Sequence, residues 1–312
     1  MIYLQLLLGF ALLVAGGEAL VRGAVSMAGR LGVSPLLIGL TLVGFGTSTP
    51  ELVTSLQAAL DGLPGIAVGN VVGSNVANIL LILGVAALIA PLSVARRGFG
   101  RDGTALALAT LLCVVAILHG MLDRWLGGVL LAALAGYLVW AYLTDRTAAP
   151  DPDATADVAP LSGPLWLALV LALGGIAVTI LGARLAVDAA ATLALLWGLS
   201  ETVVGLTIVA VGTSLPELVT SVMAALRRQS AIAFGNVVGS NVYNILGILG
   251  VTALVRPIAV PPQIAALDVW VMVAATAALI AAVVLRQRIG RATGAGFVAA
   301  YAGYTAWLVT SA

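Results

Sequence analysis

The sequence predicts an all-α polytopic membrane protein of about ten transmembrane helices, arranged as two inverted repeats of five helices each. Three observations support this fold class. Of the 312 residues, 62% are hydrophobic and only 9% are charged, whereas soluble domains carry about 25% charged residues. Apolar runs recur along the whole chain, and its two halves are similar to one another at a fixed offset.

Ten stretches are long and apolar enough to cross a bilayer, which requires about 20 mostly apolar residues per helix. The polar positions between them place the predicted spans at 3–25, 33–60, 67–89, 103–120, 125–143, 165–193, 199–226, 232–255, 266–285 and 291–310. The first stretch lacks a basic leader and a small-residue cleavage site, so we interpret it as a retained span. The single cysteine, Cys113, excludes a disulfide framework and a cysteine-based metal cluster.

The segment 144–163 is the one long polar stretch of the sequence, with three Pro and four Asp. This composition is typical of a flexible, exposed loop. We therefore expect a first repeat at 1–143 with spans 1 to 5, a cytoplasmic linker at 144–163, and a second repeat at 164–312 with spans 6 to 10.

Four linker residues resemble the start of an EF-hand loop, namely Asp151, Asp153, Thr155 and Asp157. The glycine and the bidentate glutamate of that motif are missing, so no calcium site is expected there.

The distribution of the charges predicts the orientation in the membrane. All 14 basic residues are arginines, and if successive helix ends alternate between the two sides, eleven of them fall on one side and three on the other. Cytoplasmic loops carry the excess of basic residues in membrane proteins. Both termini are therefore expected outside the cytoplasm.

A shift of 166 residues superposes the two halves of the sequence without a gap. Residues 32–60 and 198–226 are identical at 18 of 29 positions, and residues 67–84 and 233–250 are identical at 15 of 18. Because each half holds an odd number of spans, the two repeats must cross the membrane in opposite directions. Inverted repeats with a binding site between them are typical of secondary transporters.

The second and seventh spans share the motif GTSxPELVTS, in which glycine and proline interrupt an apolar helix. Pro50 has no N–H for the carbonyl of Gly46, so the helix must bend or open there, and Gly212 and Pro216 repeat the pattern. Carboxylate and hydroxyl groups stand beside these breaks, on Thr47, Ser48, Glu51, Thr213, Ser214 and Glu217. Oxygen donors of this kind suit a hard cation such as Ca²⁺ or Na⁺.

A pair of acids within membrane helices indicates a functional site, because burying each acid costs at least about 2.5–3.5 kcal/mol. The third and eighth spans add neutral oxygen donors with a spacing of four residues, which puts both donors of a span on one helix face. These donors are Ser74 with Asn78, and Ser240 with Asn244. Asn70 and Asn236 stand at the start of the same spans, where capping of free N–H groups and a functional role both remain open.

Two further pairs of charged residues lie in the first and sixth spans. Glu18 and Arg22 are four residues apart, and at the offset of 166 their counterparts are Arg184 and Asp188, with the signs reversed. At this spacing two side chains are neighbours on a helix surface. We expect an ion pair within each helix, rather than a role in gating.

The doubled motifs GTSxPELVTS and GNVVGSNxxNIL resemble the two α-repeats of the calcium/cation antiporter superfamily, in particular its prokaryotic sodium/calcium exchanger branch. With the flanking spans, the resemblance covers nearly the whole chain. It implies a core bundle of spans 2, 3, 7 and 8, with the long spans 1 and 6 lying across it as a sliding gate. It also implies an integral protein of a prokaryotic inner membrane.

Carried over residue by residue, the resemblance implies a Ca²⁺ site made by two carboxylates and two main-chain carbonyls, from Glu51, Glu217, Thr47 and Thr213. It implies that Na⁺ uses the same glutamates with further oxygens, from Ser48, Ser74 and the carbonyl of Gly44 in one repeat and from Ser214, Ser240 and the carbonyl of Ala210 in the other. Asn78 and Asn244 then form a symmetric neutral pair. The potassium-dependent branch carries an acid at the position of Asn244, so the resemblance favours K⁺-independent exchange.

The expected function is therefore a secondary antiporter that exchanges Na⁺ for Ca²⁺ by alternating access, and that moves net charge. Proton-coupled relatives tend toward GNAxE where this chain has GTSTPE and GTSLPE, which favours Na⁺ over H⁺. An H⁺/Ca²⁺ antiporter remains the alternative, and a cation channel could also use carboxylates and broken helices. We expect no enzymatic activity, no cofactor, no nucleic-acid partner and no obligate protein partner. The expected partners are Ca²⁺, Na⁺ and the lipid bilayer.

Overall fold

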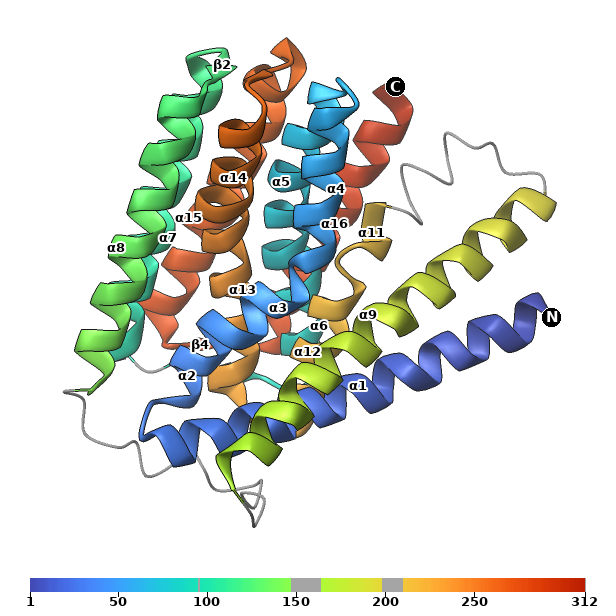
Figure 1. Ribbon diagram of the computed structural model, residues 1–312, viewed down its shortest axis with the longest axis vertical. Helices are drawn as coiled ribbons and strands as arrows, with labels where there is room; N and C mark the ends of the chain where they lie inside the picture. The colour runs from blue at the N-terminus through green and yellow to red at the C-terminus, as the bar shows by residue number, and fades with distance from the viewer. Residues whose placement is uncertain (95, 147–163, 198–209, 312) are drawn as a thin grey trace.

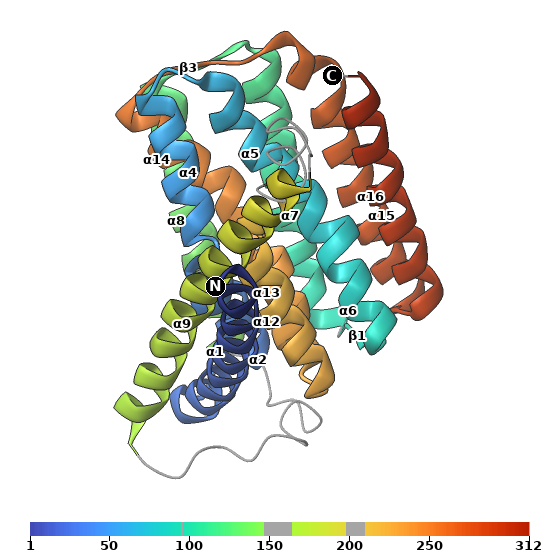
Figure 2. The ribbon, with the colours of Figure 1, turned by 90° about the vertical axis from the view of Figure 1, so that its right-hand side faces the viewer.

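The structure is a computed structural model that describes residues 1–94, 96–146, 164–197 and 210–311. These residues form an almost wholly helical protein, shown in Figure 1 and, turned by 90°, in Figure 2. Two long helices lie side by side at a slant to the other helices, α1 (Ile2–Leu31) and α9 (Leu165–Leu196). Most of the predicted linker and the start of the seventh predicted span lie outside the described residues.

The first repeat continues after α1 with a broken second span, a third span that contains a turn of π-helix, and two long helices. Its elements are α2 (Pro35–Ile38), the π-helix η1 (Gly39–Val43), α3 (Gly44–Thr47), α4 (Thr49–Leu60), α5 (Pro64–Ala77), the π-helix η2 (Asn78–Ile82), α6 (Leu83–Ile89), β1 (Leu92–Ser93), α7 (Arg96–Leu118), β2 (Met121–Leu122) and α8 (Arg124–Arg146).

The second repeat follows the same order after α9. Its elements are α11 (Ala210–Gly212), α12 (Leu215–Leu226), α13 (Ser230–Val242), the π-helix η4 (Tyr243–Ile248), α14 (Leu249–Val255), β3 (Ile258–Ala259), the π-helix η5 (Ile264–Asp268), α15 (Val269–Arg286), β4 (Arg288–Ile289) and α16 (Arg291–Ser311). An offset of 166 residues relates both ends of α4 to those of α12, and both ends of α6 to those of α14. The repeat seen in the sequence therefore extends to the helix boundaries.

Among the described residues, seven helices are long and apolar enough to cross a membrane, and the bent pair Pro35–Thr47 and Thr49–Leu60 makes an eighth. The shorter helix α12 occupies the described part of the seventh predicted span, and α16 occupies the tenth. Helices thus lie in all ten predicted spans, as the predicted fold class requires.

Several helices are longer than the predicted spans. The first helix ends at Leu31 instead of residue 25, and α7 begins at Arg96 instead of residue 103. Hydropathy marks the part of a helix that matches the hydrocarbon layer. The hydrogen-bonded helix continues beyond that layer, because arginine side chains can extend toward water from its ends.

Two short antiparallel sheets join the repeats at opposite ends of the molecule. Strand β1 pairs with β4, with Leu92 opposite Ile289, and β2 pairs with β3, with Leu122 opposite Ile258. Each sheet contains one strand from each repeat. Figures 1 and 2 show β2 and β3 at the upper end and β1 and β4 at the lower end. The two sheets therefore hold the repeats together at both ends, as expected for an inverted pair.

The helices α1 and α9 approach closely along a row of glycines. A Cβ atom on Gly16 would lie 2.6 Å from the main-chain nitrogen of Thr179, and one on Gly175 would lie 2.5 Å from that of Leu20. Small residues allow this backbone approach in membrane helices, where packing replaces the hydrophobic driving force between helices. The two slanted helices are therefore packed as one unit.

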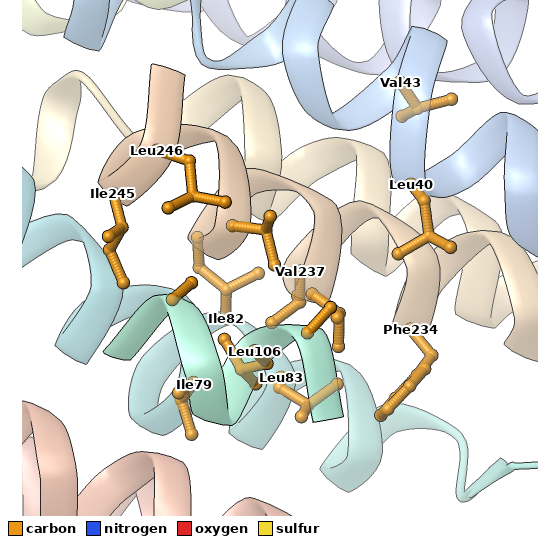
Figure 3. Packing of buried hydrophobic residues seen from close by; sticks show 14 of the residues in the cluster. Leu40, Val43, Ile79, Ile82, Leu83, Leu106, Phe234, Val237, Ile245 and Leu246 are labelled. Carbon is orange, nitrogen blue, oxygen red and sulfur yellow. The ribbon is translucent and has the colours of Figure 1, made fainter. Parts of the chain in front are cut away.

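The core lies between the third and eighth spans. Figure 3 shows aliphatic side chains of η2 and α6 facing those of α13 and η4, among them Ile82, Leu83, Val237 and Leu246. Ile82, Leu83 and Val237 are fully buried. This apolar contact packs the third span of one repeat against the eighth span of the other.

Candidate cation site

The second span is broken next to the predicted motif. Helix α3 ends at Thr47, α4 begins at Thr49, and the two halves of the span are bent by 45°. Pro50 lies in the first turn of α4, where a missing N–H is tolerated. The Gly46 carbonyl, which Pro50 cannot satisfy, accepts a hydrogen bond from Thr49 Oγ1 at 2.9 Å. In the second repeat α12 begins directly after Ser214 and also carries its proline in the first turn.

The two predicted acids lie immediately after these breaks. Glu51 and Glu217 are each 1% exposed and each lies in the first turn of its helix, where the helix dipole favours a negative charge. Ser48 Oγ donates a hydrogen bond to Glu217 Oε1 at 2.8 Å, and Ser214 Oγ donates one to Glu51 Oε1 at 3.0 Å. The serine at each break therefore binds the acid of the other repeat, which brings the two breaks together.

Buried oxygen atoms without a hydrogen-bond partner gather on the predicted ligands. They include the second oxygen, Oε2, of both Glu51 and Glu217 and the amide oxygens of Asn78 and Asn244, and the amide nitrogen of Asn78 is also unpartnered. Outside the predicted ligands, Thr220 Oγ1 and both amide atoms of Asn241 are buried without a partner as well. Buried polar atoms nearly always have a partner in folded proteins. Four unpartnered acceptors on four predicted ligands therefore indicate a site that a positively charged group would complete.

The third and eighth spans supply the neutral donors, as predicted. Asn244 Nδ2 donates to Ser74 Oγ at 3.0 Å, and Ser240 Oγ donates to the Gly44 carbonyl at 3.2 Å. Both hydrogen bonds join one repeat to the other. Asn78 opens η2 and Asn244 lies in η4. Turns of π-helix within α-helices are frequent at functional sites.

The remaining predicted ligands lie on the same segments. Gly44 and Thr47 bound α3, Ala210 begins α11, and Thr213 lies between α11 and α12. The buried Thr47 hydroxyl donates to the Val43 carbonyl at 3.0 Å. Within the described chain, no hydrogen bond joins the Asn78 side chain to another predicted ligand. The structure thus joins the serine at each break to the acid of the other repeat and joins Asn244 to Ser74, and it leaves the side chain of Asn78 without a partner.

Asn70 and Asn236 do not cap their helices, so that interpretation is wrong. Helix α5 begins six residues before Asn70, at Pro64, and α13 begins six residues before Asn236, at Ser230. Asn70 Nδ2 donates to the Glu51 carbonyl at 3.1 Å, and Asn236 Nδ2 donates to the Glu217 carbonyl at 3.2 Å. Each amide therefore holds the main chain of a glutamate, a role that only the packing of neighbouring helices reveals.

The asparagines also bind the serine that follows each glutamate by four residues. Asn70 Nδ2 lies 2.8 Å from Ser55 Oγ, and Asn236 Nδ2 lies 2.9 Å from Ser221 Oγ. The motif letters PELVTS contain both serines, but their spacing alone gave no reason to single them out. Through these asparagines the two serines are linked to the glutamate main chain.

One of the two predicted ion pairs is present. Arg22 Nε lies 2.6 Å from Glu18 Oε1 on α1. Arg184 and Asp188 form no ion pair within the described part of the chain, so the prediction for α9 is wrong. Both side chains are exposed, and an exposed pair gains too little free energy to hold two long side chains together.

A buried charged cluster between α7 and α8 was not predicted. Arg101 Nε lies 2.6 Å from Asp102 Oδ1, Arg101 Nη1 donates to the Ala141 carbonyl at 2.8 Å, and Tyr137 donates to Asp102 at 3.3 Å. Adjacent opposite charges at 101 and 102 were the available signal. Since the charges and hydroxyl satisfy one another, this cluster ties two helices together and offers no open ligand.

The chemistry of the site follows from its acceptors. No group of three or more His, Cys, Asp or Glu side chains lies together in the described residues, so a cation here would depend on two carboxylates and on neutral oxygens. Such a ligand set suits hard cations, which take carboxylate, carbonyl and hydroxyl oxygens. Soft metals prefer sulfur or imidazole ligands, which this site lacks among the residues described above.

Residues 1–143 and 167–310 match the protein-family model described as "Sodium/calcium exchanger protein". The chain is 38% identical over 312 residues to "Putative antiporter CaxA" of Alkalimonas amylolytica, which covers 98% of both chains. It is 34% identical over 294 residues to "Sodium/calcium exchanger MaX1" of Methanosarcina acetivorans, which covers 83% of this chain and 84% of that protein.

The fold is similar to that of a solved exchanger. A structure of the sodium-calcium exchanger NCX_Mj soaked with 2.5 mM Na⁺ and 10 mM Sr²⁺ superposes with a TM-score of 0.84 at 32% sequence identity. The match covers 98% of this chain and 99% of that chain. The similarity therefore extends over both repeats and the site between them.

Proposed function

This chain belongs to the sodium/calcium exchanger family, and from that membership and the site geometry we propose that it exchanges Na⁺ for Ca²⁺ by alternating access. The family consists of transporters and not of enzymes, so the chain is an integral membrane protein that carries out cation/Ca²⁺ antiport. The coupling ion, the ligands and the charge moved per cycle are the substance of the proposal.

The single observation that carries the proposal is the set of unpartnered acceptors on Glu51, Glu217, Asn78 and Asn244. Two buried carboxylates, contributed by opposite repeats, balance the charge of one Ca²⁺. We propose that the main-chain carbonyls of Thr47 and Thr213 complete the Ca²⁺ site. The hydroxyls of Ser48 and Ser214 donate hydrogen bonds to the carboxylates, which supports their role as additional neutral ligands.

Na⁺ would bind the same acids in competition with Ca²⁺. Its proposed further ligands are one set from each repeat: Ser48, Ser74 and the Gly44 carbonyl, and Ser214, Ser240 and the Ala210 carbonyl. The hydroxyl of Ser240 already contacts the Gly44 carbonyl at 3.2 Å, which supports a shared site for these two groups. Because neutral oxygens outnumber the two acids, more than one Na⁺ can be bound for each Ca²⁺ released.

Two features of the site bear on which ion is coupled to Ca²⁺ and on whether K⁺ is needed. Asn244 is neutral and donates to Ser74, which supports exchange without K⁺. The motif GTSxPE has two hydroxyl residues directly before each break, which supports Na⁺ as the coupling ion. H⁺/Ca²⁺ antiport remains a second candidate, because the unpartnered oxygen of each buried glutamate could hold a proton as well as a cation.

Obligatory exchange follows from the burial of the acids. Two carboxylates that are 1% exposed carry uncompensated charge when no cation is bound, and such charge is costly at membrane depth. The loaded site would therefore move between the two sides more readily than the empty one. We propose that α1 and α9, packed as one unit across the broken spans, slide to expose the site to each side in turn.

The proposed membrane arrangement has repeats at 1–143 and 164–312 and a cytoplasmic linker at 144–163. The excess of arginines on one side supports termini outside the cytoplasm. The prokaryotic relatives support a location in the inner membrane of a prokaryote.

The test is the flux of radiolabelled Ca²⁺ into proteoliposomes under an imposed Na⁺ gradient, and separately under an imposed pH gradient. Uptake driven by the Na⁺ gradient alone supports the proposal. Uptake that follows the pH gradient and ignores Na⁺ assigns the second candidate. Uptake that needs no counter-ion, with single-channel currents in bilayers, would overturn both and identify a channel.

A further inference from the structure

An ion pair joins the slanted unit to the core. Arg227, directly after α12, donates to Glu18 of α1 through Nη2 at 2.6 Å and through Nε at 2.9 Å. Two parallel N–H donors on one carboxylate give a pairing with a fixed geometry. Arg22, four residues further along α1, binds the same carboxylate. Glu18 is thus shared between a partner on its own helix and a partner on the core.

The offset between the repeats maps this triad onto a second triad of reversed sign. Adding 166 to Glu18 gives Arg184, and adding 166 to Arg22 gives Asp188. Subtracting 166 from Arg227 gives Asp61, which directly follows α4. The first triad is therefore an acid with two arginines, and the second triad is an arginine with two acids. Both triads can form the same ion pairs.

The second triad is open in this structure. Asp61 accepts hydrogen bonds from Gln57 Nε2 of its own helix, at 2.9 and 3.1 Å. Arg184 is exposed and forms no ion pair with any described residue. In the first triad Arg227 of the core is therefore joined to Glu18 of α1. In the second triad Asp61 and Arg184 form no ion pair.

Packing shows the same asymmetry. A Cβ atom on Gly17 of α1 would lie 3.0 Å from Val219 Cγ1 and 3.2 Å from Met223 Cγ, so α1 lies against the face of α12 that ends in Arg227. The corresponding face of α4 consists of Val53, Gln57 and Asp61. Val53 is 53% exposed, the other two are exposed, and α9 makes no contact with α4 comparable to that of α1 with α12.

The inverted repeats predict the structure of the second access state, in which the site is open to the other side of the membrane. In such transporters the two access states arise when one repeat or bundle moves against the other around a fixed site, so that each repeat takes up the conformation of its counterpart. The contact of Glu18 with Arg227 is then replaced by the contact between Arg184 and Asp61. Figure 2 shows α4 and α12 in opposite halves of the molecule, so the two contacts close opposite sides of the site.

We propose that Glu18–Arg227 and Arg184–Asp61 are two alternating latches, each closed in one access state, which set the balance between those states. This inference rests on the proposed alternating-access function. Arg22 gives Glu18 a second partner on its own helix, whereas Arg184 is exposed and forms no ion pair with any described residue while its latch is open. Partly exposed ion pairs contribute little free energy. The latches therefore bias the two states and do not lock either one.

The first test is cross-linking in the full-length protein with Cys113→Ala, reconstituted in proteoliposomes. One variant carries Glu18→Cys with Arg227→Cys, and a second carries Asp61→Cys with Arg184→Cys. The control carries Glu18→Cys with Asp61→Cys, two positions that neither state brings together. We expect oxidation to link both test pairs and not the control pair, and each link to stop Ca²⁺ flux that a reductant restores.

The second test separates a latch from a purely structural contact. Arg227→Gln should increase cross-linking of the 61/184 pair, and Asp61→Asn should increase cross-linking of the 18/227 pair, each by about 1.5- to 5-fold, the range that an exposed ion pair allows. The double charge exchange Glu18→Arg with Arg227→Glu should restore the original yield. A structural contact would not shift the yield at the distant pair.

The outcomes distinguish this inference from the proposed function. If the 61/184 pair never links in a protein that still exchanges Na⁺ for Ca²⁺, or if Arg227→Gln leaves its yield unchanged, the latch proposal is wrong and the exchange proposal stands. If both pairs link in turn but Ca²⁺ flux ignores Na⁺, the latches stand and the coupling ion is wrong.

Discussion

Ser48 Oγ lies 2.8 Å from Glu217 Oε1, although 169 residues separate the two in the sequence. The mirrored contact, between Ser214 and Glu51, spans 163 residues. Each repeat therefore completes the acid of the other, and neither half of the chain forms the site alone. This crossing makes the two acids equivalent targets for mutation.

Replacing Glu51 or Glu217 with glutamine should abolish exchange while the protein still folds. The amide keeps the size of the side chain and removes the charge that one divalent cation needs. The measurement is Na⁺-driven Ca²⁺ uptake in proteoliposomes, with size-exclusion behaviour in detergent as the control for folding. Normal uptake in either variant would contradict the assignment of both acids to one site.

Gly175→Ala should impair folding or transport, whereas Gly174→Ala should not. A Cβ at Gly175 would lie 2.5 Å from the main-chain nitrogen of Leu20, and a Cβ at Gly174 would meet nothing within 4 Å. Overpacking of this kind costs about 1–3 kcal/mol. Thermal unfolding in detergent and Ca²⁺ uptake measure the two effects. Equal behaviour of the neighbouring variants would show that α1 and α9 are not closely packed in the membrane.

The sequence predicts the ten spans and the identity of the acids, because hydropathy and a repeated motif are local properties. It does not predict which serine meets which acid, since that depends on how the inverted repeats cross. The capping interpretation of Asn236 fails for a related reason. A hydropathy minimum suggested a helix start near this residue, whereas α13 begins at Ser230 and the amide reaches a neighbouring helix.

The charged pairs on α1 and α9 also show what a local sequence pattern cannot predict. A spacing of four residues predicts an ion pair equally for Glu18 with Arg22 and for Arg184 with Asp188. Only the first pair forms, next to Arg227. The difference lies in which helix of the core approaches, and no local pattern contains that information.

Asn236→Ala should lower thermal stability more than Asn70→Ala. Asn236 is fully buried and its amide oxygen also lies 3.2 Å from Thr47 Oγ1 of the other repeat, while Asn70 is partly buried. Removing one partner of a buried hydrogen bond costs about 1–3 kcal/mol. The comparison is made by thermal unfolding of both variants in the same detergent. A larger loss for Asn70→Ala would show that this difference in burial does not decide stability.

Deleting most of residues 147–161 should leave transport nearly intact. These residues have the composition of a solvated tether, and the family model matches the chain on either side of them. Ca²⁺ uptake of the shortened protein, compared with that of the full chain at several Ca²⁺ concentrations, is the measurement. Loss of Ca²⁺ activation on changing only Asp151, Asp153 and Asp157 to Asn would instead reveal a regulatory site in the linker.

Exchange should be electrogenic, because the site has only two formal negative charges. With asparagine at both 78 and 244, one Ca²⁺ brings the sum of Glu51, Glu217 and cation to zero. The hydroxyls of four serines and the carbonyls at the breaks are numerous enough to accept more than two Na⁺, and a site so loaded carries net positive charge.

Entry of Na⁺ in exchange for Ca²⁺ should therefore move positive charge inward and respond to membrane potential, at about 2.3 kcal/mol per charge per 100 mV. Ca²⁺ flux is measured in proteoliposomes whose potential is set by K⁺ and valinomycin, with Glu51→Gln vesicles as the control for leak. Ca²⁺ uptake in vesicles prepared without K⁺ and valinomycin tests independence from K⁺. A rate that ignores the imposed voltage would mean that two Na⁺ balance one Ca²⁺, and that the neutral oxygens bind no further ion.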